Sequence, residues 1–317
     1  MKRYKKLCLE AEQGIAFEVE EGRNQELIIK SKFIYDDYKE DYYFKKYVQD
    51  AKYQIPPIPE GYKHICGDVY NGYVIERCSD GSQFVWVPVK FLIPDGTLDG
   101  KVFEEKFGRR YYIEEKDVYG IGFYEDLTDE LSAQIESITN YGGFYISRFD
   151  ISQSEDGKPQ SVKGCFPWVN ISYNEAKKVA SSFENTEYVK SHLTFGAEYD
   201  SVVAWFFMAK EMRFKEITEA FFLDMPHNAG NWGEYIMRTG SHEQWCIKNI
   251  YDYNGNVKEL THERHTIYGK KNKFDSPVTR GGSYKHCEAF AGRSTSIYAP
   301  DNSQEDDVGF RIALYIK

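Results

Sequence analysis

The residues best suited to chemistry lie in the C-terminal third of the chain. Residues 249–261 read NIYDYNGNVKELT and place Asp252, Asn254, Asn256 and Glu259 around Gly255. Hard oxygen ligands interleaved with a turn glycine suit Ca²⁺. Taken alone, the segment is better explained as a polar turn whose Asn side chains bond to its own backbone.

Histidine and cysteine give weaker signals. His262 and His265 form an HxxH pair, which on a helix would place two imidazoles on one face. The flanking residues do not favour a helix, so we expect a surface pair and no metal site. The six cysteines are scattered without a CxxC, which argues against a zinc site and favours reduced thiols in a cytosolic protein. The sequence has no GxGxxG, GxxxxGK[ST], GxSxG or HExxH motif.

Composition limits the partners. The chain has 317 residues, of which 41% are hydrophobic, and a net charge of −10. It can therefore bury a sizeable core without disulfides or metals. The acidic balance argues against nonspecific nucleic-acid binding. No apolar run approaches the ~18 residues of a membrane span, and no apolar stretch follows the basic start, so we expect neither a span nor a signal peptide.

Proline and glycine divide the chain. The cluster Ile55-Pro-Pro-Ile-Pro59 predicts a boundary between a charged, Tyr-rich segment (1–55) and a domain (56–317). Residues 18–53 could form an amphipathic helix or a polar arm, and a solvated segment explains them better than a binding surface. We expect loop and irregular structure over 90–130.

Several elements follow from pattern. The runs GYVIERC and QFVWVPV, separated by Ser79-Asp-Gly-Ser82, predict a hairpin. Residues 142–152 (GGFYISRFDIS) and the closing VGFRIALYIK predict strands. Ser172 and Glu175 form a capping box that predicts a helix over 173–183, and a second helix should begin near Thr194. Two helices among short strands indicate an α+β fold.

Four segments in fixed order carry a family resemblance. They are GGFYISRFDIS, PWVNISYNEAKKVA with SHLTFGAEYDSVVAW, NIYDYNGNVKELT, and VTRGGSY with AGRSTSIYAP and DDVGFRIAL. Together they resemble the formylglycine-generating enzyme (sulfatase-modifying factor) family, with core motifs over 142–317. The resemblance implies a variant of the C-type lectin fold: small twisted antiparallel sheets, two helices and much irregular loop.

The resemblance also implies a metal site. Asp252, Gly255, Val257 and Glu259 match the family's calcium-binding turn. Lys258 and Leu260 stand where the family usually has Trp, and they flank the implied Ca²⁺ site without forming it.

The family's catalytic cysteine pair is absent. Its positions, a few residues beyond RGGSY, are occupied here by His286 and Ala291, and Cys287 lies one position away. One thiol cannot supply the two thiolates that hold Cu(I), so Cys287 is better explained as a small buried residue. The histidine pattern of the iron-dependent sulfoxide synthases that share this fold is also missing. His286, Cys287 and Glu288 remain the weak catalytic candidates.

Two functions stay open. The first is a non-catalytic protein that binds a protein or cell-surface ligand through the stretch between RGGSY and GFR, because rigid scaffolds with variable loops suit recognition. Proteins of this fold include phage receptor-binding proteins and targets of diversity-generating retroelements, so the location would be the cytoplasm or a virion. The aromatic, small and polar residues of this stretch, typical of adaptable binding surfaces, are Tyr284, His286, Glu288, Phe290, Ser294, Ser296, Tyr298, Asp301 and Ser303. The alternative is a Cu- or Fe-dependent oxidoreductase acting on a thiol substrate.

Overall fold

The computed structural model forms two compact units, residues 1–55 and 56–317. It describes, with side chains, five stretches: 55–89, 129–206, 231–264 (without 232 and 234), 276–285 and 301–317. For the following it describes the backbone alone: 4–7, 17–21, 27–31, 111–112, 120–125, 207–208, 265–268, 273–275 and 295–296.

The first unit contains an antiparallel meander. Its strands are β1 (Tyr4–Leu7), β2 (Phe17–Glu21) and β3 (Leu27–Ser31), in the order β1-β2-β3. A helix, one of the two alternatives considered for residues 18–53, is wrong at β2 and β3, because their backbones pair as strands. The Tyr-rich stretch 32–54 lies outside the described residues.

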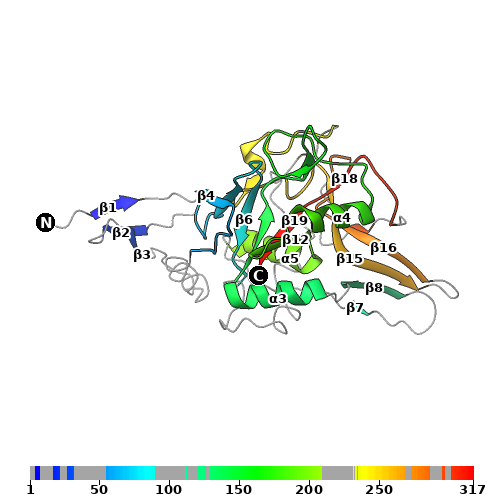
Figure 1. Ribbon diagram of the computed structural model, residues 1–317, viewed down its shortest axis with the longest axis horizontal. Coiled ribbons are helices and arrows are strands. Elements are labelled where there is room, and N and C mark those ends of the chain that lie inside the picture. The colour runs from blue at the N-terminus through cyan, green and yellow to red at the C-terminus, as the bar shows by residue number, and fades with distance from the viewer. Residues whose placement is uncertain are drawn as a thin grey trace, which may run out of the picture. The chain divides into compact units, whose positions relative to one another are not determined.

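A six-stranded sheet in the order β12-β19-β9-β6-β5-β4 forms the centre of the second unit (Figure 1). Its strands are β4 (Tyr62–Cys66), β5 (Val74–Arg77), β6 (Gln83–Val87), β9 (Phe144–Ser147), β12 (Val189–Leu193) and β19 (Ile312–Ile316). The predicted hairpin is confirmed as β5–β6, whose turn is held by Asp80 Oδ1 accepting from Ser82 N over 3.0 Å. The predicted strand 142–152 is shorter: it ends at Ser147, and only Ser152–Gln153 pairs again, as β10 with β11 (Pro159–Gln160).

A second sheet carries the C-terminal motifs. It has the order β17-β16-β15-β8-β7, and β18 joins the start of β15 in parallel. Its strands are β7 (Tyr111–Tyr112), β8 (Gly120–Glu125), β15 (Lys258–Tyr268), β16 (Lys273–Arg280), β17 (Thr295–Ser296) and β18 (Val308–Phe310). A short pair, β13 (Cys246–Ile247) and β14 (Ile250–Tyr251), precedes it. The long β15–β16 hairpin was not predicted, because KELTHERHTIY is polar and has no clear alternation.

Three helices complete the described part, with a short 3₁₀ turn at Glu243–Trp245. Helix α4 (Tyr173–Phe183) confirms the prediction, including its capping box: Glu175 N donates to Ser172 Oγ over 3.3 Å, and Ser172 N donates back to Glu175 Oε2 over 3.0 Å. Helix α5 (Gly196–Met208) confirms the second predicted helix.

Helix α3 (Asp129–Tyr141) was not predicted. It buries Leu131, Gln134, Ser137 and Ile138 along one face. The helix ends where Gly142 takes φ 85°. Loop structure over 90–130 is therefore wrong at β7, β8 and the start of α3, because here a single buried stripe decides helix formation over weak local signals.

The predicted closing strand is two strands that belong to different sheets. Val308–Phe310 pairs with β15, whereas Ile312–Ile316 pairs with β12 and β9. Arg311 stands at the crossing, and its side chain points inward with 1% of its surface exposed. One residue therefore joins the two sheets.

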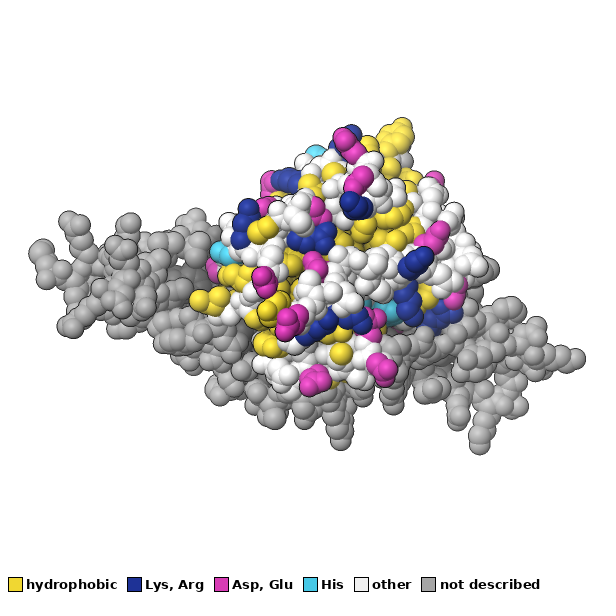
Figure 2. All heavy atoms as spheres, viewed as in Figure 1, with side chains coloured by type: hydrophobic (Ala, Val, Ile, Leu, Met, Phe, Trp, Pro, Cys, Tyr) yellow, Lys and Arg dark blue, Asp and Glu magenta, His cyan; other side chains and the backbone are white. Residues whose placement is uncertain are grey.

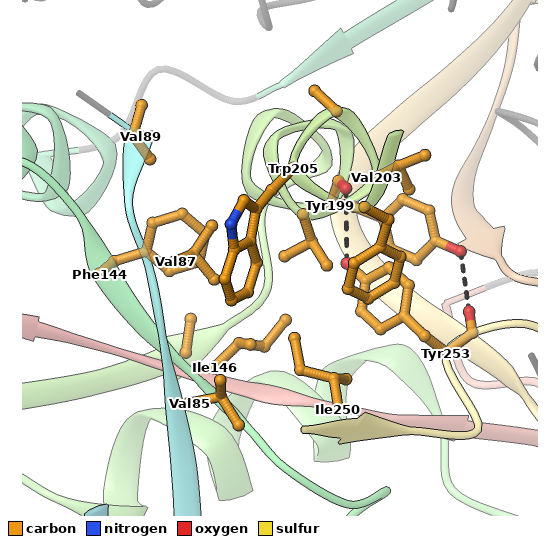
Figure 3. Packing of buried hydrophobic residues seen from close by; sticks show 14 of the residues in the cluster. Val85, Val87, Val89, Phe144, Ile146, Tyr199, Val203, Trp205, Ile250 and Tyr253 are labelled. Atoms are coloured by element: carbon orange, nitrogen blue, oxygen red, sulfur yellow. Dashed lines mark hydrogen bonds between the residues drawn. The ribbon is translucent and has the colours of Figure 1, made fainter. Parts of the chain in front are cut away.

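The core lies between the central sheet and α5 (Figure 3). Trp205 is fully buried there among Val85, Val87 and Phe144. Apolar burial of this kind contributes roughly 25 cal/mol per Å² of surface removed from water. With three helices and small antiparallel sheets, the α+β prediction is confirmed.

Candidate functional site

Two consecutive glycines begin the predicted ligand segment. Strand β16 ends at Arg280, and Gly281 and Gly282 follow with φ 85° and 71°. A Cβ at Gly281 would lie 3.0 Å from both Glu259 Oε2 and the Tyr253 carbonyl. Only glycine accepts this left-handed backbone and this close approach without strain. The RGGS motif is therefore a turn that directs the chain away from the sheet.

A buried ion pair and a hydrogen bond meet at Asp307, which follows that segment. Lys258, at the start of β15, lies 3.1 Å from Asp307 Oδ2, and both side chains are almost fully buried. Ser283 Oγ donates to the same Asp307 oxygen over 2.7 Å. Lys285 and Asp306 form a further, exposed ion pair. Ser283 precedes the segment and Asp307 follows it, so their hydrogen bond closes the loop between them, and the ion pair holds Asp307 to β15.

The far end of the segment also packs on α4. Asp301 Oδ1 accepts from Arg264 Nη1 over 2.7 Å. Gln304 Nε2 donates over 3.0 Å to Glu175 Oε2, the carboxylate of the capping box. Asn170 N donates to the Glu305 carbonyl over 2.9 Å. The start of α4 is thus a second fixed support.

The predicted ligand-binding residues divide into three groups. Tyr284, Asp301 and Ser303 are half-buried at the two ends, and Tyr284 N donates to the Asn256 carbonyl over 3.0 Å. Ser296 lies in β17, opposite Val278. Those that lie outside the described residues are His286, Glu288, Phe290, Ser294 and Tyr298, together with Cys287 of the catalytic candidates.

The predicted calcium turn is buried beneath these ends. Asp252 and Asn256 take φ 54° and 60°. Asp252 Oδ2 accepts from Thr239 Oγ1 over 2.9 Å and from Gly240 N over 2.8 Å. Gly255 N donates to the Gly281 carbonyl over 2.7 Å. The turn therefore holds three segments together through its own backbone and side chains.

An arginine, Arg311, neutralises part of this region. Its Nε lies 2.6 Å from Glu259 Oε1, and its Nη2 lies 2.8 Å from Asp150 Oδ1. Burial raises the pKa of Asp150 to about 7, against the opposing effect of Arg311. Burial likewise raises the pKa of Glu259 well above its usual range, and that of Asp252 to a lesser degree. Three desolvated carboxyl groups thus compete for one guanidinium.

The fit of these residues to Ca²⁺ is incomplete. Asp252 Oδ1, Asn254 Oδ1 and Glu259 Oε2 are buried oxygens without a hydrogen-bond partner among the described residues. The other oxygens of Asp252 and Glu259 already accept from protein donors, and Val257 is fully buried. Within the stretches that the structure describes, no three His, Cys, Asp or Glu side chains converge as metal ligands. Calcium binding stays a prediction.

Two arginines of the sequence motifs have structural partners that the sequence did not reveal. Arg280 is fully buried; it donates from Nε to Glu263 Oε2 over 2.9 Å and from Nη1 to Asp200 Oδ1 over 3.2 Å. Arg311 pairs as described above. The Arg in RGGS and the Arg in GFR could have signalled buried ion pairs, because each stands in an otherwise apolar or glycine-rich run.

The HxxH prediction is wrong for His262. This side chain is 1% exposed, stacks on Phe195 at 4.5 Å between ring centroids, and has no hydrogen-bond partner for either ring nitrogen among the described residues. His192 is also buried, with Nε2 2.9 Å from Glu198 Oε1. Both rings pack inside the domain, and His262 lies in the part of β15 where the pairing with β16 shifts register.

Part of the surface can be described directly. On the face shown in Figure 2, hydrophobic side chains are interspersed with charges of both signs. In the part of the chain that the structure describes, no helix is long and apolar enough to cross a lipid bilayer.

Comparison with known proteins adds little. No family model matches the chain, and no curated protein does. Among solved structures, the chain is similar to PvdO from Pseudomonas aeruginosa, with 14% identity, a TM-score of 0.40, and coverage of 76% of this chain and 97% of that one. It is also similar to Treponema denticola variable protein 1, with 14% identity, a TM-score of 0.34, and coverage of 81% and 99%.

Proposed function

We propose that this protein binds a protein or cell-surface ligand through residues 284–303 and is not an enzyme. The observation that carries the proposal is the hydrogen bond between the residues that flank this segment, Ser283 and Asp307, together with the ion pair that holds Asp307 to Lys258 of β15. A segment closed at its base can vary in sequence without disturbing the sheets beneath it. This is the arrangement that a recognition scaffold requires.

The charged groups beneath the segment support binding more than catalysis. Arg280 and Arg311 are saturated by internal carboxylates and carbonyls. A catalytic group has to reach substrate, whereas these side chains are at most 1% exposed. They stabilise the platform from which the segment extends.

The proposal includes the family resemblance seen in the sequence. A lectin-type scaffold of the sulfatase-modifying-factor kind, encoded by a phage or diversified by a retroelement, would use this segment as its variable surface, in the cytoplasm or on a virion. Flanking DNA tests that origin. A reverse-transcriptase gene and an imperfect copy of the 3′ end of the reading frame would support it, and their absence would remove it.

The binding itself can be tested without a known ligand. The purified full chain is presented to a yeast-displayed library of random twelve-residue peptides and to an array of defined glycans. We expect specific binders whose affinity falls in Tyr284→Ala and Asp301→Ala and is unchanged in Tyr188→Ala, an exposed tyrosine on another segment. If neither the peptide library nor the glycan array yields a specific binder, the proposal is contradicted.

The oxidoreductase alternative is tested by measuring the metal content of the purified protein and its oxygen consumption. Its candidates, His286, Cys287 and Glu288, lie outside the described residues. Stoichiometric copper or iron together with oxygen consumption in the presence of a thiol would overturn the binding function.

A further inference from the structure

Two exposed aromatic side chains, Phe166 and Tyr235, lie on the loops that hold Arg238. Phe166 is 50% exposed and Tyr235 is 73% exposed. The guanidinium carbon of Arg238 lies 4.4 Å from the centroid of the Phe166 ring. Large aromatic side chains with this much exposure are costly in water, so their position calls for a reason.

The backbone beneath these side chains is fixed on both sides. Gly164 N donates to the Thr239 carbonyl and Thr239 N donates to the Cys165 carbonyl, each over 2.8 Å. Arg238 Nη1 donates to the Gly164 carbonyl over 2.9 Å. The Thr239 side chain is fully buried and bonds to Asp252. A backbone that is already fixed loses little further entropy when a partner binds, and aromatic side chains have few rotatable bonds to order.

Arg238 differs from its charged neighbours in having no carboxylate among the described residues. Lys163 pairs with Glu243 over 2.5 Å, and Arg264 pairs with Asp301 over 2.7 Å. The guanidinium of Arg238 instead uses one nitrogen for a backbone carbonyl and one face for Phe166. Its remaining donors suit a carboxylate, which a guanidinium can bind through two parallel hydrogen bonds.

These loops are joined to the predicted ligand segment through Asn256. Its carbonyl accepts from Tyr284 N over 3.0 Å, and its Oδ1 accepts from Met237 N over 3.0 Å. Asn231 Nδ2 donates to the Tyr235 carbonyl over 2.6 Å and to Asn256 Oδ1 over 3.3 Å. The start of the segment and the loop that carries Tyr235 and Arg238 are therefore both bonded to one buried residue, Asn256.

We infer that Phe166, Tyr235 and Arg238 form a fixed subsite that binds a protein partner through an acidic side chain next to an apolar one. The inference rests on the proposed binding function and names part of its partner's chemistry. Tyr and Arg are enriched among the residues that dominate protein–protein binding energy. Here Arg238 packs on Phe166, and Tyr235 is exposed three residues earlier on the same anchored loop. The partner's carboxylate would bind the Arg238 guanidinium, which has no carboxylate among the described residues, and its apolar neighbour would cover the exposed rings.

The displayed peptide library tests the inference. We expect enriched peptides to carry Asp or Glu beside an aliphatic or aromatic residue. Arg238→Glu and Tyr235→Ala should each weaken these peptides by about tenfold or more, which corresponds to ~1.4 kcal/mol. Replacing the peptide's acid by Lys should restore binding to Arg238→Glu. Matched controls are Tyr188→Ala and Lys158→Glu, both exposed and on other segments.

The outcomes separate this subsite from the function on which it rests. Melting curves of all variants show whether a loss of peptide binding in Arg238→Glu reflects unfolding. Arg238→Gln, which keeps hydrogen-bond donors without the charge reversal, is a second check. If Phe166, Tyr235 and Arg238 variants bind normally while Tyr284→Ala and Asp301→Ala lose binding, the subsite is wrong and the function stands. If neither set changes binding, both are wrong. Binding to glycans alone also overturns the subsite.

Discussion

Arg311 Nε donates to Oε1 of Glu259 over 2.6 Å, and both side chains are almost completely excluded from solvent. The pair lies where the closing strand passes from one sheet to the other. Glu259 stands in β15, opposite Arg280 of β16 and opposite Gly309 of β18. One ion pair thereby joins residues of all the C-terminal motifs.

Breaking this pair should destabilise the fold strongly. Arg311→Met leaves Glu259 and Asp150 buried without their cation, and a lost partner in a buried pair costs roughly 3–5 kcal/mol. Urea unfolding measures the loss in free energy of unfolding for Arg311→Met, Glu259→Leu and the double variant. The double variant should lose less than the sum of the two single losses. Lys158→Met, which removes an exposed pair, should leave the free energy of unfolding nearly unchanged, because water screens exposed charges. Additive losses would show that the two side chains do not interact.

Lys258 should control how firmly the ligand segment is closed at its base. Lys258→Met leaves Asp307 buried with Ser283, while Lys258→Arg keeps the charge. We expect the Met variant to be cut faster by trypsin within 285–293 and to be less stable by roughly 3 kcal/mol. The Arg variant should recover most of the resistance. Equal cleavage of all three proteins would show that the pair does not hold the segment.

His262 should make the fold sensitive to acid. Burial, together with the nearby His192 and Lys177, lowers the pKa of His262 well below its ordinary 6.5. The neutral ring is therefore favoured in the folded state, and His192 itself faces Glu198. The contribution of neutral His262 to the free energy of unfolding is fully present above pH 6.5. It is lost as the pH falls below 6.5 towards the folded-state pKa of His262.

His262→Phe removes this dependence. The substitution keeps the stack on Phe195 and replaces two buried nitrogens that have no partner among the described residues. We expect the free energy of unfolding at pH 7.5 to stay within ~1 kcal/mol of wild type or to rise, and its decline below pH 6.5 to become shallower. His242→Phe, at an exposed histidine, is the control. An unchanged pH profile in His262→Phe would refute this account.

Calcium binding needs a test that spares Arg311. Glu259→Ala would destabilise the protein with or without the metal, because it removes the partner of Arg311. The wild type and Asp252→Asn are better compared in calcium and in chelator. A site at a hundredfold excess of Ca²⁺ over its Kd would stabilise the wild type by ~2.7 kcal/mol, and the Asn variant by less. Identical melting of the wild type in both buffers excludes the site.

Local sequence signals determined several elements correctly. The capping box at Ser172 and Glu175 and the Asp80-Gly81 hairpin are decided by bonds between residues at most three apart, so they could be predicted without the rest of the fold. The turn at Gly255 and the paired glycines after Arg280 also stand in the sequence as motifs. Their predicted calcium ligands, by contrast, depend on what surrounds them.

Only the tertiary structure decided where the charged motif residues go. Glu259 was predicted as a metal ligand and contacts Arg311, which is 52 residues away; His262 was predicted at the surface and is buried. The contact between Ser283 and Asp307 and the patch around Arg238 likewise join residues that no local pattern connects. A buried charge needs a partner of opposite sign, and the chain supplies that partner from whichever segment packs there. Sequence periodicity indicates which side of a single helix or strand is buried. The partner of a buried charged side chain depends on which elements pack against each other.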